Sequence, residues 1–98
     1  MVDQRAVDRD EVHYRARGFG PDAREHLLLV VNISPHGLMA RIDADYEPGQ
    51  RMRVTLPVVG VTTAEIRWSL GGRMGFHFDT AIDLASYYEM LTRMIEKR

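Results

Sequence analysis

The sequence contains no cysteine, which excludes disulfide bonds, thiolate metal sites and a cysteine nucleophile. This absence also fits a reducing compartment. No apolar run approaches the roughly eighteen residues of a membrane-spanning helix. The N-terminus is charged throughout and lacks the apolar core of a signal peptide. We therefore expect a cytoplasmic protein that has no membrane partner.

Positive charge is not in excess, because 13 Lys and Arg face 14 Asp and Glu and give a formal net charge of -1. Nucleic-acid polymers are attracted by a surplus of basic side chains, so we expect no such partner. Lys97 is the single lysine, and all other basic residues are arginine. Arginine grips phosphate with paired hydrogen bonds and stacks on flat rings, so a small anionic ligand remains compatible with this composition.

Motifs of known catalytic chemistry are also missing. Ser34 lacks the G-x-S-x-G context of a nucleophile elbow, and no phosphate-binding loop or dinucleotide fingerprint occurs. No two of the four histidines lie at a metal-ligand spacing; they are His13, His26, His36 and His77. We therefore expect a protein that is not an enzyme, with no catalytic residues, no metal site and no cofactor.

Most of the chain alternates between apolar and polar residues, with Gly- and Pro-rich turns between the segments. This pattern predicts six strands, at residues 12–17, 24–33, 37–43, 51–57, 60–70 and 73–79. Within the fourth segment, Met52, Val54 and Leu56 are expected to share one face. Gly71-Gly72 is expected to turn the last hairpin.

The periodicity changes near residue 80. Apolar residues now recur at three- and four-residue spacing and predict a helix over about residues 82–97. Thr80 or Asp83 can cap its start. The expected apolar face of this helix consists of Leu84, Tyr87, Tyr88, Leu91, Met94 and Ile95. Six strands followed by one helix predict a mainly β fold of one domain, an antiparallel barrel or sandwich closed at one end by the helix.

The stretch Asn32–Gly37, "NISPHG", separates two apolar runs and predicts a six-residue loop shaped to hold a ligand. Asn32 offers a donor and an acceptor in one plane, which suits the edge of a guanine. Ser34 offers a hydroxyl to a phosphate oxygen, and Gly37 permits close approach of a ligand or of backbone. The alternative is an Asx-type turn in which Asn32 and Ser34 bond their own backbone, and the loop by itself favours that alternative.

Asn32-x-Ser34-x-x-Gly37 resembles the (Asp/Asn)-x-Ser-x-x-Gly motif of PilZ domains, bacterial modules that bind cyclic di-GMP. The composition yields this motif by chance only about 0.02 times. The pair Arg5 and Arg9 resembles the family's Arg-x-x-x-Arg signature, which this arginine-rich chain yields about once by chance. The pair precedes the loop motif as it does in the family, and the later strands also resemble the family. The resemblance covers nearly the whole chain.

The resemblance implies a small six-stranded antiparallel β-barrel at residues 12–98, ending in the helix, after a flexible arm at residues 1–11. It also implies a cyclic di-GMP receptor. Arg5 and Arg9 would engage phosphates and guanines, Asn32 a guanine edge and Ser34 a phosphate, while Gly37 keeps the loop compact. Binding would order the arm over the barrel and change the surface that the domain offers to a partner protein.

Two other functions are compatible with the sequence. One is a PilZ-fold protein–protein adaptor with weak or no nucleotide binding, in which Arg5 and Arg9 are solvated charges. For the receptor itself, the candidate surfaces for a partner protein are residues 58–61, "VVGV", and the C-terminal helix. The weaker one is a barrel for single-stranded nucleic acid, which needs surface aromatics along a basic groove. The chain has few aromatics and no positive surplus.

Overall fold

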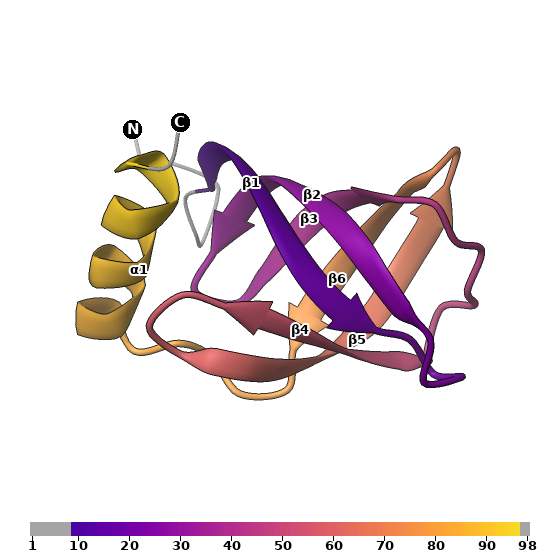
Figure 1. Cartoon of the computed structure of the whole chain (residues 1–98). Helices are drawn as coiled ribbons and strands as arrows, with labels where there is room; N and C mark the ends of the chain where they lie inside the picture. The colour runs from indigo at the N-terminus through magenta and orange to yellow at the C-terminus, as the bar shows by residue number, and fades with distance from the viewer. Residues whose placement is uncertain (1–8, 97–98) are drawn as a thin grey trace, which may run out of the picture.

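The computed structural model describes residues 9–96, and within them the chain forms six strands and one helix (Figure 1). The elements are β1 (Asp10–Phe19), β2 (Glu25–Ser34), β3 (Gly37–Ile42), β4 (Arg51–Leu56), β5 (Gly60–Leu70), β6 (Arg73–Phe78) and α1 (Leu84–Glu96). All neighbouring strands are antiparallel, and they close into a barrel in the order β1-β2-β3-β6-β5-β4. The predicted six-stranded barrel with a C-terminal helix is confirmed.

The core fills the inside of the barrel with one side of each strand. Met52, Val54 and Leu56 of β4 are only 1%, 0% and 2% exposed, so their expected common face is confirmed. Alternation works here because successive strand residues point to opposite faces, and a closed barrel has an apolar inside and a wet outside. Gly71 and Gly72, with φ of 60° and 79°, make the two-residue turn between β5 and β6.

The first strand begins earlier than the alternation indicates. β1 starts at Asp10 because Asp10 pairs with Ile33, and Glu11 with Asn32. These residues are charged, so their sequence gives no strand signal, and hydrogen bonding to β2 decides their conformation. The last two residues of the expected arm at 1–11 therefore belong to the barrel, and residues 1–8 lie outside the described part.

The helix α1 lies across one end of the barrel, as expected (Figure 1). Of the two candidate caps, Asp83 holds the position, because its Oδ2 accepts a hydrogen bond of 3.1 Å from the Ser86 N–H. This bond lowers the pKa of Asp83. Within residues 9–96, no helix has the length and apolar character that crossing a bilayer requires.

The expected single apolar face of α1 is only partly buried. Of its members, Tyr87 and Met94 are buried by the barrel, whereas Leu84, Tyr88 and Ile95 are exposed. The barrel also buries Met90, which the expected face did not include. A helix lying on a convex barrel end touches it along a narrow stripe, so the barrel covers only part of a wide apolar surface.

Candidate ligand-binding site

The stretch between β2 and β3 is a tight hairpin. Ser34 pairs with Gly37, so only Pro35 and His36 form the turn, and the expected six-residue loop is wrong. The carbonyl oxygens of the turn accept main-chain hydrogen bonds of 2.8 Å from Phe78 to His36 and 2.9 Å from Ile82 to Pro35. These bonds attach the hairpin to the end of β6 and to the segment before α1, which a sequence pattern cannot show.

A β-bulge at Val31 determines where Asn32 points. Val30 pairs with Ala40 and Asn32 with Met39, which leaves Val31 as an extra residue in β2. The bulge shifts the alternation by one residue, so Val30 and Ile33 both face the core. Asn32 is thereby placed on the outside of the barrel.

On the outside, Asn32 meets one of the two arginines that the sequence singles out. Arg9 Nη1 donates a hydrogen bond of 2.7 Å to Asn32 Oδ1, across 23 residues of chain. The guanidinium has five N–H groups, so it retains further donors, and the Asn32 amide retains its NH₂. The structure therefore brings Arg9 and Asn32 together, while Arg5 lies outside the described residues.

Ser34 and Gly37 have structural tasks inside the hairpin. Ser34 is 3% exposed, and its Oγ accepts a hydrogen bond of 3.1 Å from the His36 N–H, as the turn alternative predicts for this residue. A Cβ on Gly37 would lie 2.1 Å from the Phe76 carbonyl oxygen, so only glycine lets β3 pack this closely against β6. A contact of Ser34 with a ligand stays a prediction.

Tyr87 of α1 fastens the two strands that carry the Arg9–Asn32 pair. Its hydroxyl donates to the Asp10 carboxylate and lies 3.0 Å from the Ile33 carbonyl oxygen. Burial, followed by the hydrogen bond to Asp10, raises the pKa of Tyr87 well above its usual value. Asp10 is next to Arg9 and Ile33 is next to Asn32, so this tyrosine fixes the backbone beneath the pair.

A row of cross-strand neighbours continues from Asn32 across the outer surface. Asn32 pairs with Met39, Met39 with Gly75, and Gly75 with Trp68. A Cβ on Gly75 would lie 2.1 Å from Trp68 Nε1, so the indole rests directly on the glycine, and the side chain is 40% exposed. The row thus ends in a flat aromatic surface that the sequence analysis did not assign to the site.

Three arginines form the next row on the same side. Arg15 and Arg41 both pair with Leu29, and Arg41 pairs on its other side with Arg73. Like charges on directly opposite strand positions repel each other. Within residues 9–96, none of the three has an ion pair. We call this outer surface of β1, β2, β3 and β6 the arginine face.

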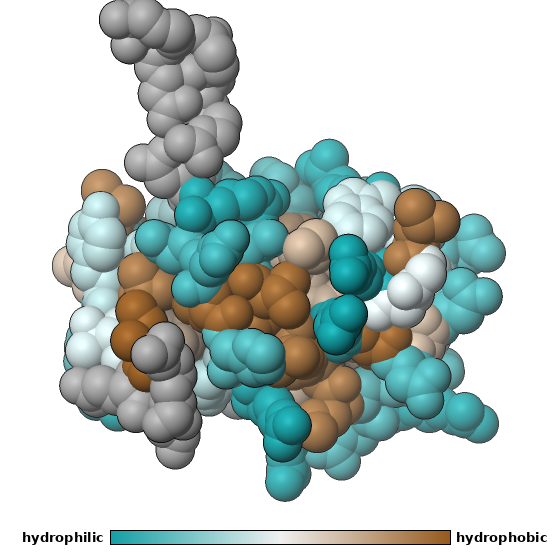
Figure 2. Space-filling view, turned by 90° about the horizontal axis from the view of Figure 1, so that it is seen from above, coloured by the Kyte–Doolittle hydropathy of each residue, from teal (hydrophilic) through white to brown (hydrophobic). Residues whose placement is uncertain are grey.

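The arginine face is hollowed. A pocket of about 450 Å³ is lined by Arg15, Leu27, Leu29, Arg41, Ile42, Asp43, Gly71 and Gly72. Figure 2 looks down on the β1–β2 side of the barrel and shows apolar surface bordered by hydrophilic side chains. An apolar floor bordered by two arginines and one carboxylate, Asp43, can accept a flat ligand that carries negative charge. Strand alternation alone places these arginines outside, but only the register places them in one row.

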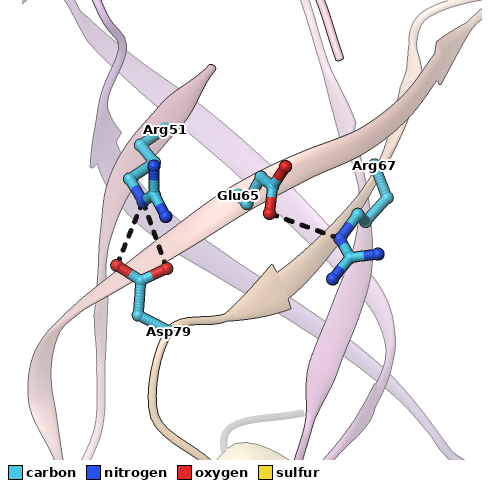
Figure 3. A network of polar contacts seen from close by, with 4 residues as sticks. All are labelled: Arg51, Glu65, Arg67 and Asp79. Carbon is cyan, nitrogen blue, oxygen red and sulfur yellow. Dashed lines mark hydrogen bonds and ion pairs between the residues drawn. The ribbon is translucent and has the colours of Figure 1, made fainter. Parts of the chain in front are cut away.

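The other side of the barrel differs in its charge pairing. Arg51 Nε lies 3.2 Å from both carboxylate oxygens of Asp79, and Arg67 Nε lies 3.5 Å from Glu65 Oε1 (Figure 3). We call this surface, carried by β4, β5 and the residue after β6, the paired face. Arg51 and Arg67 already have carboxylate partners, and Arg53 of β4 lies over the Phe19 ring, so this face has less capacity for an anionic ligand.

The histidines show no grouping for chemistry within the described residues. His26 Nε2 lies 2.7 Å from the Tyr46 hydroxyl, which donates a bond of 2.7 Å to Asp22. The bond from Tyr46 lowers the pKa of Asp22, while burial and then Asp22 raise the pKa of Tyr46. These contacts tie the β1–β2 turn to the chain before β4. Within residues 9–96, no three His, Asp or Glu side chains are grouped to hold a metal ion.

These features define a small closed β-barrel domain with one arginine-rich outer face and a helix across one end. The sequence model of the PilZ domain matches residues 3–97, so the chain belongs to the PilZ domain family. Its fold is similar to a solved structure described as the PilZ domain with c-di-GMP of YcgR from Escherichia coli, with a TM-score of 0.60 at 14% identity. That similarity covers 97% of this chain and 93% of the other. No curated protein matches the sequence.

Proposed function

We propose that the protein is a non-enzymatic receptor for cyclic di-GMP in the bacterial cytoplasm, and that the ligand lies on the arginine face beside Asn32. Membership of the PilZ domain family supports this proposal, as does the shared fold of the YcgR domain described with c-di-GMP. The observation that carries it is the hydrogen bond from Arg9 to Asn32, which holds a guanidinium at the edge of the arginine face.

Arg9 is the group that recognises guanine. Guanine presents O6 and N7 as neighbouring acceptors, and an arginine fork meets both with parallel hydrogen bonds. Asn32 Oδ1 already orients the guanidinium of Arg9, which reduces the conformational entropy that binding must cost. The Asn32 amide donors remain for a further acceptor on the base or the sugar-phosphate ring.

The arginine face supplies the remaining contacts. Its two arginines nearest each other, Arg41 and Arg73, repel when no anion is present, so a phosphate between them relieves that repulsion. Trp68 offers an exposed indole on which a second purine can stack. Gly37 keeps the hairpin close to β6. Ser34 holds the turn through its hydrogen bond from the His36 N–H, and its own hydroxyl proton would be donated to a phosphate if the hairpin opens.

Closure of the N-terminal arm completes the proposed receptor. Arg5 would join Arg9 over the ligand, so the order of the arm and the surface beside it depend on ligand binding. The changed surface would then be offered to a partner protein. Amide NMR tests this step: ligand should shift the signals of residues 5–9 together with those of 32–37, and unchanged signals in the arm would contradict closure.

Calorimetry tests the receptor itself. Cyclic di-GMP titrated into the wild type should release heat, and Arg9→Ala should weaken the affinity at least about tenfold. Arg53→Ala is the matched control, because Arg53 is an exposed arginine on β4 that lies over the Phe19 ring at 5.8 Å, at the opposite end of β1 from Arg9. Its affinity should stay within about twofold of wild type. Equal losses in both variants would contradict the placement of the ligand.

The alternative function is a PilZ-fold adaptor with weak or no nucleotide binding. The exposed apolar side chains favour it, because Val58 and Val61 at the β4–β5 turn are 42% and 66% exposed. Such side chains are typical of protein contact surfaces. Absence of heat with wild type and with both variants would support the adaptor.

A further inference from the structure

The helix α1 has a second apolar stripe that the barrel does not cover. Leu84, Tyr88 and Ile95 are 58%, 60% and 45% exposed, and Leu91 between them is half-buried. We call these four residues the seam. The seam is separate from the residues that attach the helix to the core, which are Tyr87, Met90 and Met94.

The seam runs straight along α1 and lies beside the stripe of buried residues that contacts the barrel. At 3.6 residues per turn, its four side chains fall within an arc of about 60°, and the buried residues are centred about a quarter turn away. A straight stripe with spacings of four, three and four residues is the pattern of a helix that packs along another helix. Packing against the barrel core accounts for the apolar residues of the buried stripe, but it does not account for the apolar residues of the seam.

Among the described residues, the open side of the helix beside the seam is uncharged, whereas Glu11 and His13 of β1 line a hollow at the Ile95 end of the seam. On its open side lie the small exposed residues Ala85 and Thr92. The nearest described charges farther round the helix are Glu89 and Arg93, whose side chains lie 3.9 Å apart. The small uncharged side chains of this open side let a second helix approach closely, so this side of α1 favours an apolar helix as the occupant.

We propose that the seam packs antiparallel against the seam of a second copy of this chain and forms a two-fold symmetric dimer. The spacing of the seam reads the same in both directions, so reversal of the second helix places Leu84 opposite Ile95 and Tyr88 opposite Leu91. Large side chains then meet large ones without a gap. A symmetric dimer needs such a self-complementary surface, and antiparallel helices also align their dipoles favourably.

The expected dimer is weak. One helix of 13 residues offers less than the roughly 800 Å² per partner of a standard interface. The dimer should therefore dissociate at a concentration on the order of 10–100 μM. The seam contains neither Arg9, Asn32 nor Trp68, so this dimer does not depend on the proposed nucleotide site.

Sedimentation equilibrium of the full chain over about 1–500 μM tests the dimer. The weight-average mass should rise from monomer toward dimer for wild type, while Tyr88→Glu should stay monomeric across that range. Arg93→Glu inserts the same side chain on the opposite side of the same helix and should dimerise like wild type. Circular dichroism melting checks that both variants are folded. A wild type that is monomeric at every concentration, or dimers that Tyr88→Glu leaves intact, would overturn the proposal.

Cysteine cross-linking tests the antiparallel geometry, since the natural chain has no cysteine. In the proposed dimer, position 84 faces position 95 of the other copy, while the two copies of position 84 are about 16 Å apart along the axis. A disulfide needs Cα atoms within about 7 Å. A mixture of Leu84→Cys and Ile95→Cys should therefore give the mixed dimer under oxidation, and each variant alone should not cross-link. Efficient cross-linking of each variant with itself would indicate parallel helices and would contradict the proposal.

Discussion

The two faces of the barrel carry arginines in different electrostatic settings. On the paired face, Arg51 has a carboxylate within 3.2 Å and Arg67 one at 3.5 Å. On the arginine face, Arg41 stands directly opposite Arg73, and within residues 9–96 neither has an ion pair. Repulsion of this kind costs stability, so a protein that keeps it is expected to use it. Under the proposed function, this contrast lets a chain without net positive charge offer one site to an anion.

The largest expected effect comes from reversing one charge on the arginine face. Arg41→Glu replaces an attraction for phosphate by repulsion and should weaken cyclic di-GMP binding by about 100-fold, or about 2.7 kcal/mol. The fold should persist, because the new carboxylate faces Arg73. Arg53→Glu on β4 is the control, with affinity within about twofold of wild type. Calorimetry measures both, and similar losses would remove the distinction between the faces.

The next effect concerns Trp68, the only tryptophan of the chain. Its indole rests on Gly75 at the border of the arginine face, so its emission reports ligand on that side. Binding should change the fluorescence with the midpoint that calorimetry gives, and Trp68→Ala should weaken affinity about tenfold through lost stacking. Binding with unchanged emission would place the ligand elsewhere.

A smaller effect, on folding stability, tests how α1 supports the strands of the arginine face, which it contacts through Tyr87. Tyr87→Phe leaves the Ile33 carbonyl oxygen and the Asp10 carboxylate without the hydroxyl and should lower the free energy of unfolding by about 1–2 kcal/mol. Tyr88→Phe is the matched control, since Tyr88 is 60% exposed, and should have no effect. Urea denaturation measures the difference.

The same tyrosine predicts a pH dependence. The folded state raises the pKa of Tyr87, so its stabilisation is complete below the unfolded value of about 10 and decreases as the pH rises above it. Tyr87→Phe should therefore lose less stability than wild type between neutral pH and about pH 11. An equal alkaline loss in both proteins would show that other groups cause it.

The smallest effects compare stability directly between the faces. Arg73→Thr removes the charge opposite Arg41 and should raise the free energy of unfolding by about 0.5 kcal/mol in the absence of ligand. Arg51→Ala removes the partner of Asp79 and should lower it by about 0.5 kcal/mol. Urea denaturation at low salt measures both changes in the free energy of unfolding, and we expect them to have opposite signs. Changes of equal sign would mean that the difference in charge pairing between the faces has no energetic consequence.

The sequence by itself determined the strands, the helix and the family, and the resemblance to the family selected a barrel where the strand pattern allowed a barrel or a sandwich. Alternation identified the core residues of β4, and the glycine pair identified the turn at Gly71-Gly72, because strand periodicity and turn conformation are local properties. The motif from Asn32 to Gly37 indicated the PilZ domain family, to which the family model assigns the chain. It did not reveal the local conformation, since the expected loop is a two-residue turn.

Only the tertiary structure decided which side chains meet. The bulge at Val31 turns Asn32 outward to Arg9, and the register brings Arg41 beside Arg73 and Trp68 over Gly75. The packing of α1 on the end of the barrel also determines that one apolar stripe is buried and that the seam is exposed. The physical reason is the same in each case. Periodicity fixes the face on which a residue lies, whereas its neighbours depend on hydrogen bonds and packing between segments that are far apart in the chain.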